Sequence, residues 1–514
     1  MLRDRAMTAF DTAQAALAHS PALAQVSRAL AEYRERFGSA LRVALVGRVS
    51  SGKSTLANAL LGGRRAPTGV EELTFNVNWL RYGTSPGLLV HFTDGRPPER
   101  RDLADLERLT VRAHEDEALA AYLRTIDYLE VTDPNPYLRS FDLVDTPGLD
   151  TAFGSDSQNT ARFLGRTPGD VRAASLDHAG KADAIVLVFA RGLAAAEEEL
   201  LADFTGAGIG KATPITTLGA LTKVELFWPL HPDPMAEGAR VADRLMNAAG
   251  ARRYLFDLRP VASLVGAAAA VFTQEDFDDL TTLAAVPPET LTARVKRGPL
   301  FTTRDHPELK VSAARRHALF SQFGGYGIVL ACSLIRDGVT DIAELRWHLL
   351  ERSGMADFRR LLVDHFGSRT ELIKLSRAIQ DVKQLPSLAG ELGPRDHMTL
   401  DEAVAAVAQL EFKEHAFAEF SVLRDYYDGR VDFADEEIGE LLLVTGECGR
   451  TLPDRLGLPS SYGRTELAAQ ARERLAHWAA VVVDPSYSGA TRRAGQVVRR
   501  SYELLISEIN GAQP

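Results

Sequence analysis

The stretch that decides the fold is Gly-Arg-Val-Ser-Ser-Gly-Lys-Ser-Thr, residues 47–55. It matches the pattern G-x-x-x-x-G-K-S/T, follows a β-rich run that begins at Leu41, and precedes the apolar run 56–61. In that context, backbone N–H groups wrap a phosphate and the helix N-terminus adds favourable dipole charge. We expect Lys53 to reach the β- and γ-phosphates and the Ser54 hydroxyl to bind Mg²⁺. The nucleotide-binding residues predicted here are Gly47, Arg48, Val49, Ser50, Ser51, Gly52, Lys53, Ser54 and Thr55.

A second motif lies downstream, where the apolar run from Phe141 ends in Asp-Thr-Pro-Gly at residues 145–148. Behind a phosphate loop, this D-x-x-G pattern predicts that Asp145 holds Mg²⁺ through a water molecule. The Gly148 N–H is expected to contact the γ-phosphate, so the segment 149–158 can act as a switch.

A third motif, Thr222-Lys223-Val-Glu225, ends another apolar run and suits the base-reading pattern N/T-K-x-D. A carboxylate at the last position accepts two hydrogen bonds from the N1–H and N2–H₂ of guanine, which adenine cannot supply. The stem of Lys223 is expected to cover the purine plane. The motif therefore favours a guanine nucleotide over ATP, although the carboxylate here belongs to glutamate, one methylene longer than aspartate.

Short apolar runs alternate with helical stretches from residue 41 to about residue 265, which predicts an α/β domain with a mainly parallel sheet. After the first run, which begins at Leu41, the predicted strands are Val77–Tyr82, Leu88–Phe92, Asp127–Val131, Ser140–Asp145, Ala184–Ala190, Ile215–Thr222 and Leu258–Ala262.

Helical patterns flank this α/β region on both sides. Residues 1–37 carry apolar residues at helical spacing, with a break at Ser20-Pro21. Beyond residue 340 the strands stop, and four long helices are predicted over 356–383, 399–429, 465–483 and 491–509. The expected organisation is thus N-terminal neck helices at 1–37, an α/β P-loop GTPase domain at 38–340 with a proline-rich connector at 285–310, and an elongated all-α neck and trunk bundle at 341–514.

Composition narrows the class of protein. The 514 residues are 45% hydrophobic and 25% charged, as in an ordinary globular protein, and the net charge of −10 argues against non-specific nucleic-acid binding. Two distant cysteines fit a reducing cytosol. No run of about 18 uninterrupted apolar residues occurs, so any membrane contact is expected to be peripheral. No histidine pair with metal-ligand spacing was found, and His365, within an apolar stripe, is expected to be a satisfied buried histidine.

Together these motifs resemble the dynamin-like GTPases. Pro67-Thr-Gly69 followed by Thr74 looks like the switch segment of that family, which implies that Thr74 binds Mg²⁺ and positions the attacking water. The phosphate loop resembles that of the mitofusins and bacterial dynamin-like proteins. In the helical half, the stretches 323–330 and 350–361 resemble the isoniazid-inducible dynamin-like proteins of actinobacteria, closest to their C-type member. The resemblance covers nearly the whole chain.

The phosphate loop departs from dynamins proper at its third residue. Val49 stands where they have a glutamine that aids hydrolysis, although Ser50 keeps a hydroxyl at the next position. We therefore expect slow basal turnover, with Lys53, Ser54, Thr74 and Ser50 as the catalytic residues. Arg48 either supplies charge, in cis or across a dimer, or is simply solvated.

The resemblance implies a GTPase that uses GTP and Mg²⁺, whose G domains associate and whose helical stalk remodels or fuses membranes from the inner face of the cell membrane. The partner is the chain itself or a sister dynamin-like protein. Two alternatives remain: a regulatory switch whose helices bind a protein partner, and a nucleotide-binding scaffold with negligible turnover.

We also expect the loops 384–398 and 484–490 to lie at the same far tip of the helical bundle. Apolar side chains and a basic cluster there suggest a contact with anionic membrane, although the same residues could cap the end of the bundle core. The tip residues are Leu388, Leu392, Tyr487, Arg492 and Arg493.

Overall fold

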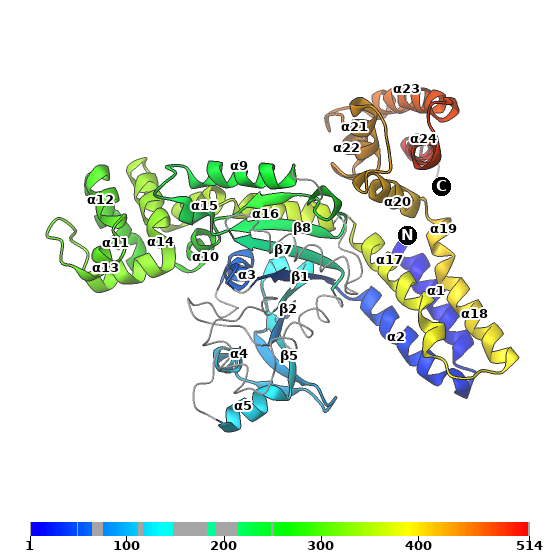
Figure 1. The fold of residues 1–514 in the computed structure, drawn as a ribbon, viewed down its shortest axis with the longest axis horizontal. Helices are drawn as coiled ribbons and strands as arrows, with labels where there is room; N and C mark the ends of the chain where they lie inside the picture. Colours follow the sequence, from blue (N-terminus) through cyan, green and yellow to red (C-terminus); the bar gives the residue numbers. More distant parts are fainter. Residues whose placement is uncertain are drawn as a thin grey trace. The chain divides into compact units, whose positions relative to one another are not determined.

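The computed structural model describes residues 2–48, 50–63, 76–110, 117–146, 182–190, 214–247, 251–367 and 369–511. The chain forms two compact units (Figure 1). The first, the G unit, comprises Leu41–Ala212 and Thr216–Leu362. The second, the helical unit, comprises Met1–Ala40, Thr213–Ile215 and Val363–Pro514.

The G unit contains a nine-stranded sheet in the order β4-β3-β5-β2-β6-β1-β7-β8-β9 among its described residues. The strands are β1 (Leu41–Gly47), β2 (Val77–Tyr82), β3 (Gly87–Phe92), β4 (Glu99–Arg101), β5 (Ile126–Asp133), β6 (Phe141–Asp145), β7 (Ala184–Ala190), β8 (Thr217–Thr222) and β9 (Leu258–Pro260). The sequence predicted all of these strands except β4, whose three charged residues carry no apolar signal.

The sheet is mostly parallel, as predicted. β1 pairs in parallel with β6 and β7, and β8 extends the parallel block from β7 to β9. β2 runs antiparallel to β6, and β3 runs antiparallel to both β5 and β4. β7 and β1 from Val43 onward are continuous apolar runs that are buried on both faces, whereas β3 alternates between buried and half-buried positions. That difference is typical of a covered parallel centre beside an antiparallel edge.

Helices pack against the sheet of the G unit. Those of the G unit are α3 (Lys53–Leu61), α4 (Leu106–Thr110), α5 (Glu117–Arg124), α9 (Pro234–Met246), α10 (Ser263–Val271), α11 (Gln274–Ala284), α12 (Pro288–Val295), α13 (Pro299–Thr303), α14 (Ala313–Arg336), α15 (Ile342–Arg352) and α16 (Met355–Leu362), with short 3₁₀ turns between them.

The prediction that residues 285–310 form a connector between the two halves of the chain is wrong. Its prolines Pro288 and Pro299 begin α12 and α13, where a missing N–H costs nothing. Both helices belong to the core of the G unit, because Leu291 and Phe301 are buried in it.

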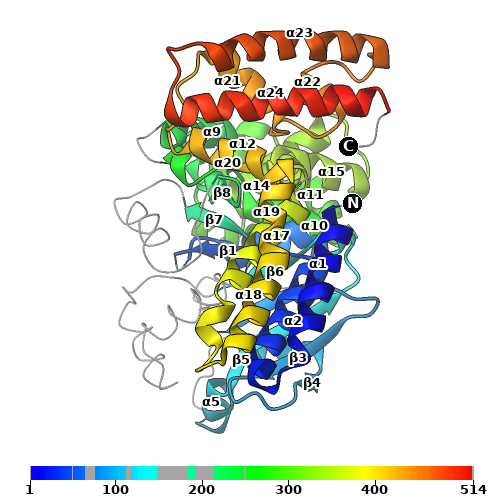
Figure 2. The ribbon, with the colours of Figure 1, turned by 90° about the vertical axis from the view of Figure 1, so that its right-hand side faces the viewer.

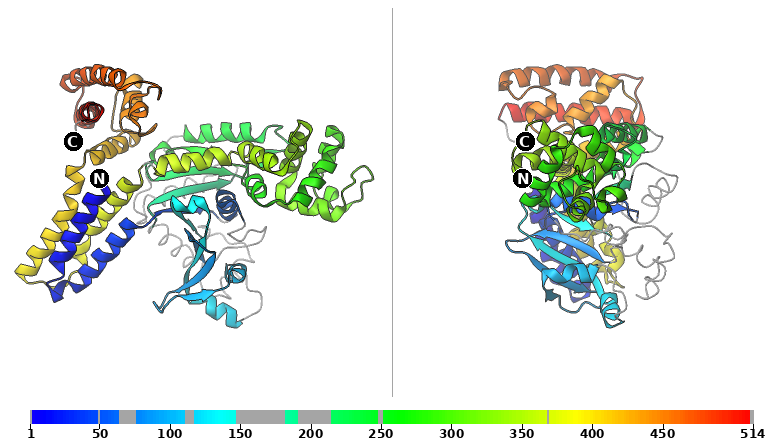
Figure 3. Two further views of the ribbon diagram at one scale, coloured as in Figure 1. Left: turned by 180° about the vertical axis from the view of Figure 1, so that it is seen from behind. Right: turned by 90° about the vertical axis from the view of Figure 1, so that its left-hand side faces the viewer.

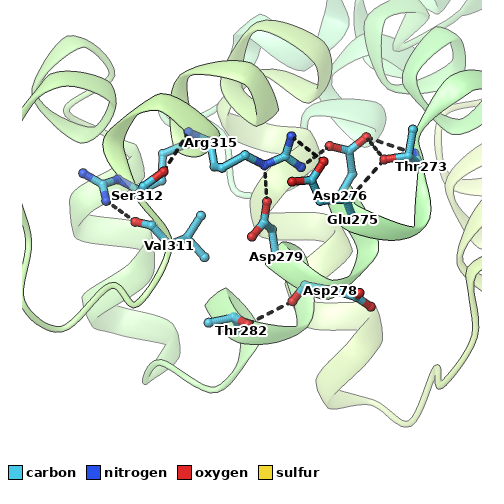
Figure 4. Close-up of polar contacts among 10 residues, drawn as sticks. Thr273, Glu275, Asp276, Asp278, Asp279, Thr282, Val311, Ser312 and Arg315 are labelled. Carbon is cyan, nitrogen blue, oxygen red and sulfur yellow. Dashed lines mark hydrogen bonds and ion pairs between the residues drawn. The ribbon is translucent and has the colours of Figure 1, made fainter.

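Arginines fix the start of α14 to the helices before it. Figure 4 shows Arg315 donating to Asp276 and Asp279 of α11. The buried Arg316 bonds to three carbonyl oxygens of the segment 301–311, including that of Phe301 at 2.8 Å.

By length and composition alone, α14 could cross a membrane, and no other helix in the described part of the chain could. Its residues Phe323, Ile328 and Cys332 are fully buried in the core of the G unit, so its apolar face is already occupied by protein.

The helical unit contains α1 (Leu2–Leu17) and α2 (Ala24–Gly38), which are separated at Ser20-Pro21 as predicted. They share one core with α17 (Thr370–Lys383) and α18 (Pro394–Ala408), and these four helices lie side by side in Figures 1 and 3. The remaining helices are α19 (Leu410–Lys413), α20 (His415–Tyr427), α21 (Asp435–Val444), α22 (Leu452–Leu456), α23 (Arg464–Val483) and α24 (Gly489–Ile509).

Two of the predicted long helices are interrupted. The helix expected over 356–383 changes at Val363–Gly367 into a π-helix, which separates α16 from α17. The helix expected over 399–429 breaks at Glu414, whose backbone is extended and whose carboxylate bonds Arg5 of α1 at 2.9 Å.

The break at Glu414 overturns the prediction of one common tip. After it, α20 packs against α24 instead of extending the bundle of α17 and α18. The loop after α17 therefore lies at one end of the helical unit, and the loop between α23 and α24 lies at another end (Figures 1 and 2).

The side chains of these two loops differ in exposure. Leu388 is 39% exposed, whereas Leu392 packs against the core of the helical unit. Tyr487 bonds Glu437 at 3.1 Å, Arg492 bonds the carbonyl of Asp484 at 3.2 Å, and Arg493 is exposed.

Candidate nucleotide-binding site

The loop between β1 and α3 has a backbone that few side chains permit. A Cβ at Gly47 would lie 2.4 Å from the carbonyl oxygen of Val188 on β7, so only glycine fits there. Ser50 and Gly52 both have positive φ, at 57° and 92°. The chain turns sharply between the end of β1 and Lys53, the first residue of α3, as a phosphate-wrapping loop requires.

Lys53 is held inside this loop. Its side chain is 7% exposed, and Nζ donates to the carbonyl oxygens of Gly47 at 3.0 Å and Arg48 at 2.8 Å. An ammonium in this place lies among the backbone groups of the loop, where phosphate oxygens would receive its hydrogen bonds.

Ser54 and Asp145 meet beside the loop. The Ser54 hydroxyl donates to Asp145 Oδ2 at 3.0 Å, and Asp145 is fully buried at the end of β6. Burial raises the pKa of Asp145 to about 6, while the charge of Lys53 and the bond from Ser54 act in the opposite direction. Its other oxygen, Oδ1, is buried and has no hydrogen-bond partner among the residues the structure describes. A hydroxyl beside a carboxylate with an unused oxygen fits a hard cation such as Mg²⁺.

The base-reading motif begins at the same edge of the sheet. Thr222, the last residue of β8, bonds the carbonyl of Ser51 in the phosphate loop and that of Phe189 on β7. Lys223 follows with a positive φ of 57° and turns the chain into a short 3₁₀ helix. Glu225 is buried, and its charge helps to raise the pKa of Tyr326, for which burial is the main cause.

Of the predicted site residues, the structure thus brings the phosphate loop, Asp145 and Thr222 together, with Lys223 and Glu225 directly after Thr222. Val49, Thr74 and Gly148, and the switch segment 149–158, lie outside the described residues.

Sequence reasoning missed two residues that lie beside the site. Thr146, inside the quoted Asp-Thr-Pro-Gly motif, bonds the carbonyl of Leu45 at 2.7 Å and ties the chain after Asp145 to β1. Ser263 begins α10, and its hydroxyl would lie 3.8 Å from a Cβ at Gly52. The signal for Ser263 was a short strand followed by an apolar helix, the same arrangement that marks the phosphate loop.

Residues 43–202 match the Dynamin family. The chain therefore carries a dynamin-family GTPase domain, with a mostly parallel sheet and a large helical region, and the resemblance noted in the sequence is confirmed.

Among curated proteins, the chain is similar to the isoniazid-induced protein IniC of Mycobacterium tuberculosis, with 27% identity over 480 residues that cover 92% of each chain. Dynamin-like protein 2 of Campylobacter jejuni is 33% identical over 141 residues, which are 27% of this chain and 22% of that protein. The bacterial dynamin-like protein of Nostoc punctiforme is 32% identical over 114 residues, or 21% and 16% of the two chains.

Two solved chains of an oligomerised bacterial dynamin pair, described as sensing and tethering membranes at long range, align at 14% identity. The alignments cover 94% and 98% of this chain and 87% and 91% of those chains, with TM-scores of 0.31 and 0.34.

Proposed function

We propose that this protein binds and hydrolyses GTP with Mg²⁺, and couples the nucleotide to association of its G domains and to peripheral membrane remodelling or fusion. The observation that carries the proposal is the arrangement around Lys53. A buried ammonium is held by the loop carbonyls of Gly47 and Arg48, next to the Ser54–Asp145 pair. Together these groups supply positive charge and backbone donors for phosphate, with ligands for a divalent cation beside them.

Ser54 and Asp145 are the described residues that would hold Mg²⁺, and Thr74 is proposed as a further ligand from the switch segment. The bound ion supplies charge neutralisation at the β- and γ-phosphates. Lys53 adds a fixed positive charge, and the N–H groups at the start of α3 face the same place. Thr74→Ala should leave nucleotide binding intact and remove hydrolysis.

Guanine selectivity is assigned to Glu225, with the stem of Lys223 against the purine. Calorimetry with GDP, ADP and non-hydrolysable analogues of GTP and ATP tests this. We expect guanine nucleotides to bind at least about tenfold more tightly, and Glu225→Ala to remove that preference, because the site is built to pair with groups that adenine lacks. Glu237→Ala, on α9 in the same unit, is the control. Equal affinities of the parent protein for GTP and ATP analogues would contradict the assignment.

Slow hydrolysis by the isolated chain is expected, because Val49 cannot orient water as a glutamine does. We propose that a second G domain, from another copy of this protein or from a sister protein, orders the site. Turnover per molecule should rise with protein concentration. A constant specific activity over about a hundredfold dilution would instead favour a self-sufficient GTPase.

Two other functions are distinguished by simple measurements. A scaffold with little turnover would bind GTP but show no single-turnover hydrolysis. A switch that acts on a protein partner would hydrolyse GTP but would not sediment with anionic liposomes. Sedimentation with anionic liposomes therefore tests the proposed peripheral contact with the inner face of the cell membrane.

A further inference from the structure

Two polar side chains lie next to each other on neighbouring strands of the G unit. Asn78 of β2 is directly opposite Asp145 of β6 in the antiparallel ladder. Side chains at opposed positions of such a ladder lie on the same face of the sheet, with their Cβ atoms about 5 Å apart. Asp145 is fully buried, and Asn78 is 1% exposed. Asn78 is therefore a buried neighbour of a residue that we propose to hold Mg²⁺.

The side chains around this pair are apolar. On the same face of the sheet, Leu129 of β5 is paired with Asn78, and Leu45 of β1 is paired with Asp145. The adjacent row of side chains on this face consists of Val131, Leu80, Leu143 and Val43. All of these apolar residues are fully buried. In the two rows, the only polar side chains are those of Asn78 and Asp145, so the pair lies at the border of an apolar core.

Three polar atoms of the pair are buried and have no hydrogen-bond partner among the residues that the structure describes. They are Oδ1 and Nδ2 of Asn78 and Oδ1 of Asp145. An unpaired buried polar atom costs free energy, and the large majority of such atoms in proteins are paired. The two side chains are neighbours that do not bond each other. This arrangement favours a third group that pairs with both of them.

The cation site adjoins these atoms. The second oxygen of Asp145, Oδ2, accepts the hydrogen bond of Ser54 at 3.0 Å, and Ser54 belongs to the first turn of α3. Mg²⁺ keeps several water ligands when it binds to a protein. A water molecule on a metal ion acts mainly as a donor, so it needs acceptors around it. Oδ1 of Asp145 and the carboxamide oxygen of Asn78 are two neighbouring acceptors beside this site.

An asparagine suits this position because it carries no charge. Its oxygen accepts a hydrogen bond as a carboxylate oxygen does, and its amide group can donate to an anionic oxygen. A second carboxylate next to Asp145 would repel the phosphates of the nucleotide. It would also disfavour the ionised form of Asp145 whenever no cation is bound.

We propose that Asn78 is a further positioning residue of the nucleotide site, and that its carboxamide and Asp145 together bind water ligands of the Mg²⁺ ion. The inference rests on the proposed binding of GTP with Mg²⁺. It adds a residue of β2 to a site that is otherwise built from the phosphate loop, the end of β6 and the base-reading motif.

Calorimetry with a non-hydrolysable GTP analogue tests this role, with excess Mg²⁺ in one series and EDTA in the other. The ratio of the two affinities isolates the contribution of the cation. Asn78→Leu keeps the approximate size of the side chain and removes its polar atoms. It should lower the ratio by about tenfold or more, as is usual for residues that orient metal ligands. The affinity in EDTA should stay within about threefold of the parent value.

Thermal unfolding of the nucleotide-free protein separates a site residue from a structural one. Asn78→Leu should raise the unfolding midpoint by about 2 °C or more, because it removes two unpaired polar atoms from apolar surroundings. Asn76→Leu is the matched control. Asn76 is 2% exposed, and its Nδ2 donates to the carbonyl of Leu109 at 2.9 Å. The same substitution there should lower the midpoint and leave the ratio of affinities unchanged.

Asn78→Asp decides the matter if the leucine variant does not fold. It keeps an acceptor oxygen in place and adds a negative charge beside Asp145. Without nucleotide, Mg²⁺ alone should raise its unfolding midpoint by at least about 3 °C more than it raises that of the parent, because the cation relieves the repulsion between the carboxylates. An equal response of the two proteins to Mg²⁺ would contradict the assignment.

Two results with Asn78→Leu would also overturn the proposal. One is a ratio of affinities equal to that of the parent. The other is a loss of stability like that of Asn76→Leu, which would show that Asn78 is paired within the fold. A parent protein that binds no nucleotide would instead refute the proposed function. A parent that binds the analogue equally well in Mg²⁺ and in EDTA would refute the proposed use of Mg²⁺, and the role of Asn78 with it.

Discussion

Among the residues that the structure describes, a buried cluster in each unit places a cation near a carboxylate, and these two clusters differ in how completely their atoms are paired. In the helical unit, Arg369 binds one oxygen of Glu447, the Tyr427 hydroxyl binds the other at 2.5 Å, and Arg369 also binds the carbonyl of Gly446 at 2.9 Å. In the G unit, Asp145 receives one hydrogen bond from Ser54 at 3.0 Å, and its Oδ1 has no partner in the described part of the chain.

Composition does not separate these clusters, since each has one basic and one acidic residue and a neighbouring hydroxyl. Pairing does. A cluster whose carboxylate is bonded on both oxygens stabilises the fold, whereas a carboxylate with an unused buried oxygen reserves it for a ligand. The helical cluster also adjoins a helix end, because the N–H groups of Gly446 and Glu447 cap α21 by donating to the carbonyls of Leu443 and Leu442, each at 2.9 Å.

The largest effect, a loss of stability, is expected from a substitution in the helical cluster. Arg369→Met leaves Glu447 as a buried charge without its cation, so the helical unit should lose about 3–5 kcal/mol of stability, while nucleotide affinity stays unchanged. Urea unfolding followed by hydrogen exchange of α21 measures the loss. Arg377→Met removes a half-exposed partner of Asp381 on α17 and should cost less than about 1 kcal/mol. Similar losses in both variants would contradict the comparison.

A substitution in the G-unit cluster should weaken nucleotide binding and leave the stability of the protein nearly unchanged. Lys53→Ala removes the ammonium from the phosphate loop and should weaken binding of GDP and GTP analogues by about a hundredfold. The stability of the nucleotide-free protein should change by no more than about 1 kcal/mol. Calorimetry and thermal unfolding of the same sample measure both quantities. Lys310→Ala, at an exposed position of the G unit, serves as control. An unfolded Lys53→Ala protein would show that this cluster, too, is structural.

The pH dependence of stability tests the difference between the two clusters at Asp145. Because its folded pKa is raised from 3.8 to about 6, the folded state binds the proton more tightly, and stability falls as pH rises from about 4 through about 6. Asp145→Asn should therefore stabilise the nucleotide-free protein by about 1–3 kcal/mol at pH 7.5, and by clearly less at pH 5.5.

The readout is thermal unfolding of parent and variant at both values of pH, without nucleotide or divalent cation. The variant should also lose most of the extra stability that the GTP analogue with Mg²⁺ gives the parent. A difference between parent and variant that is independent of pH would show that the carboxyl group does not titrate in this range.

The smallest effects are expected from the two loops of the helical unit. Because these loops lie at different ends of the unit, their contributions to liposome binding can be measured separately. If the loop before α24 meets anionic lipid, Arg492→Glu with Arg493→Glu should weaken liposome binding by about 1 kcal/mol or more per arginine. Leu388→Asp should have an effect only if the other loop inserts.

Liposome sedimentation with and without anionic lipid distinguishes these cases. Arg472→Glu, at an exposed position of α23, controls for the change of charge. Sedimentation of all three variants like the parent would exclude both loops as the membrane contact.

The phosphate loop and the parallel strands could be predicted because short-range patterns determine them. A buried parallel strand is a continuous apolar run, and a loop that wraps phosphate needs glycine where Gly47 and Gly52 stand. β4 was missed because a three-residue edge strand of charged residues gives no such pattern.

The path of the helical unit could not be predicted, since long-range contacts decide it. The break at Glu414 coincides with an ion pair to Arg5, about 400 residues away. The hydrogen bonds of Lys374 to the carbonyl of Ser39 and of His365 to that of Ile215 likewise join segments distant in sequence, and neither residue carried a motif. His365 was expected to be buried and satisfied, and that prediction is confirmed, but its partners were invisible in the sequence.

The two ends of the large sheet restrict how G units can aggregate. β4 and β9 have only three residues each; β4 is Glu-Arg-Arg, and β9 ends at Pro260, which has no N–H to offer. Short, charged or proline-bearing edges are poor templates for a strand from another molecule. Continuous β-sheets between copies of the G unit are therefore disfavoured, and crowding many copies on a surface should not by itself lead to amyloid-like pairing through these edges.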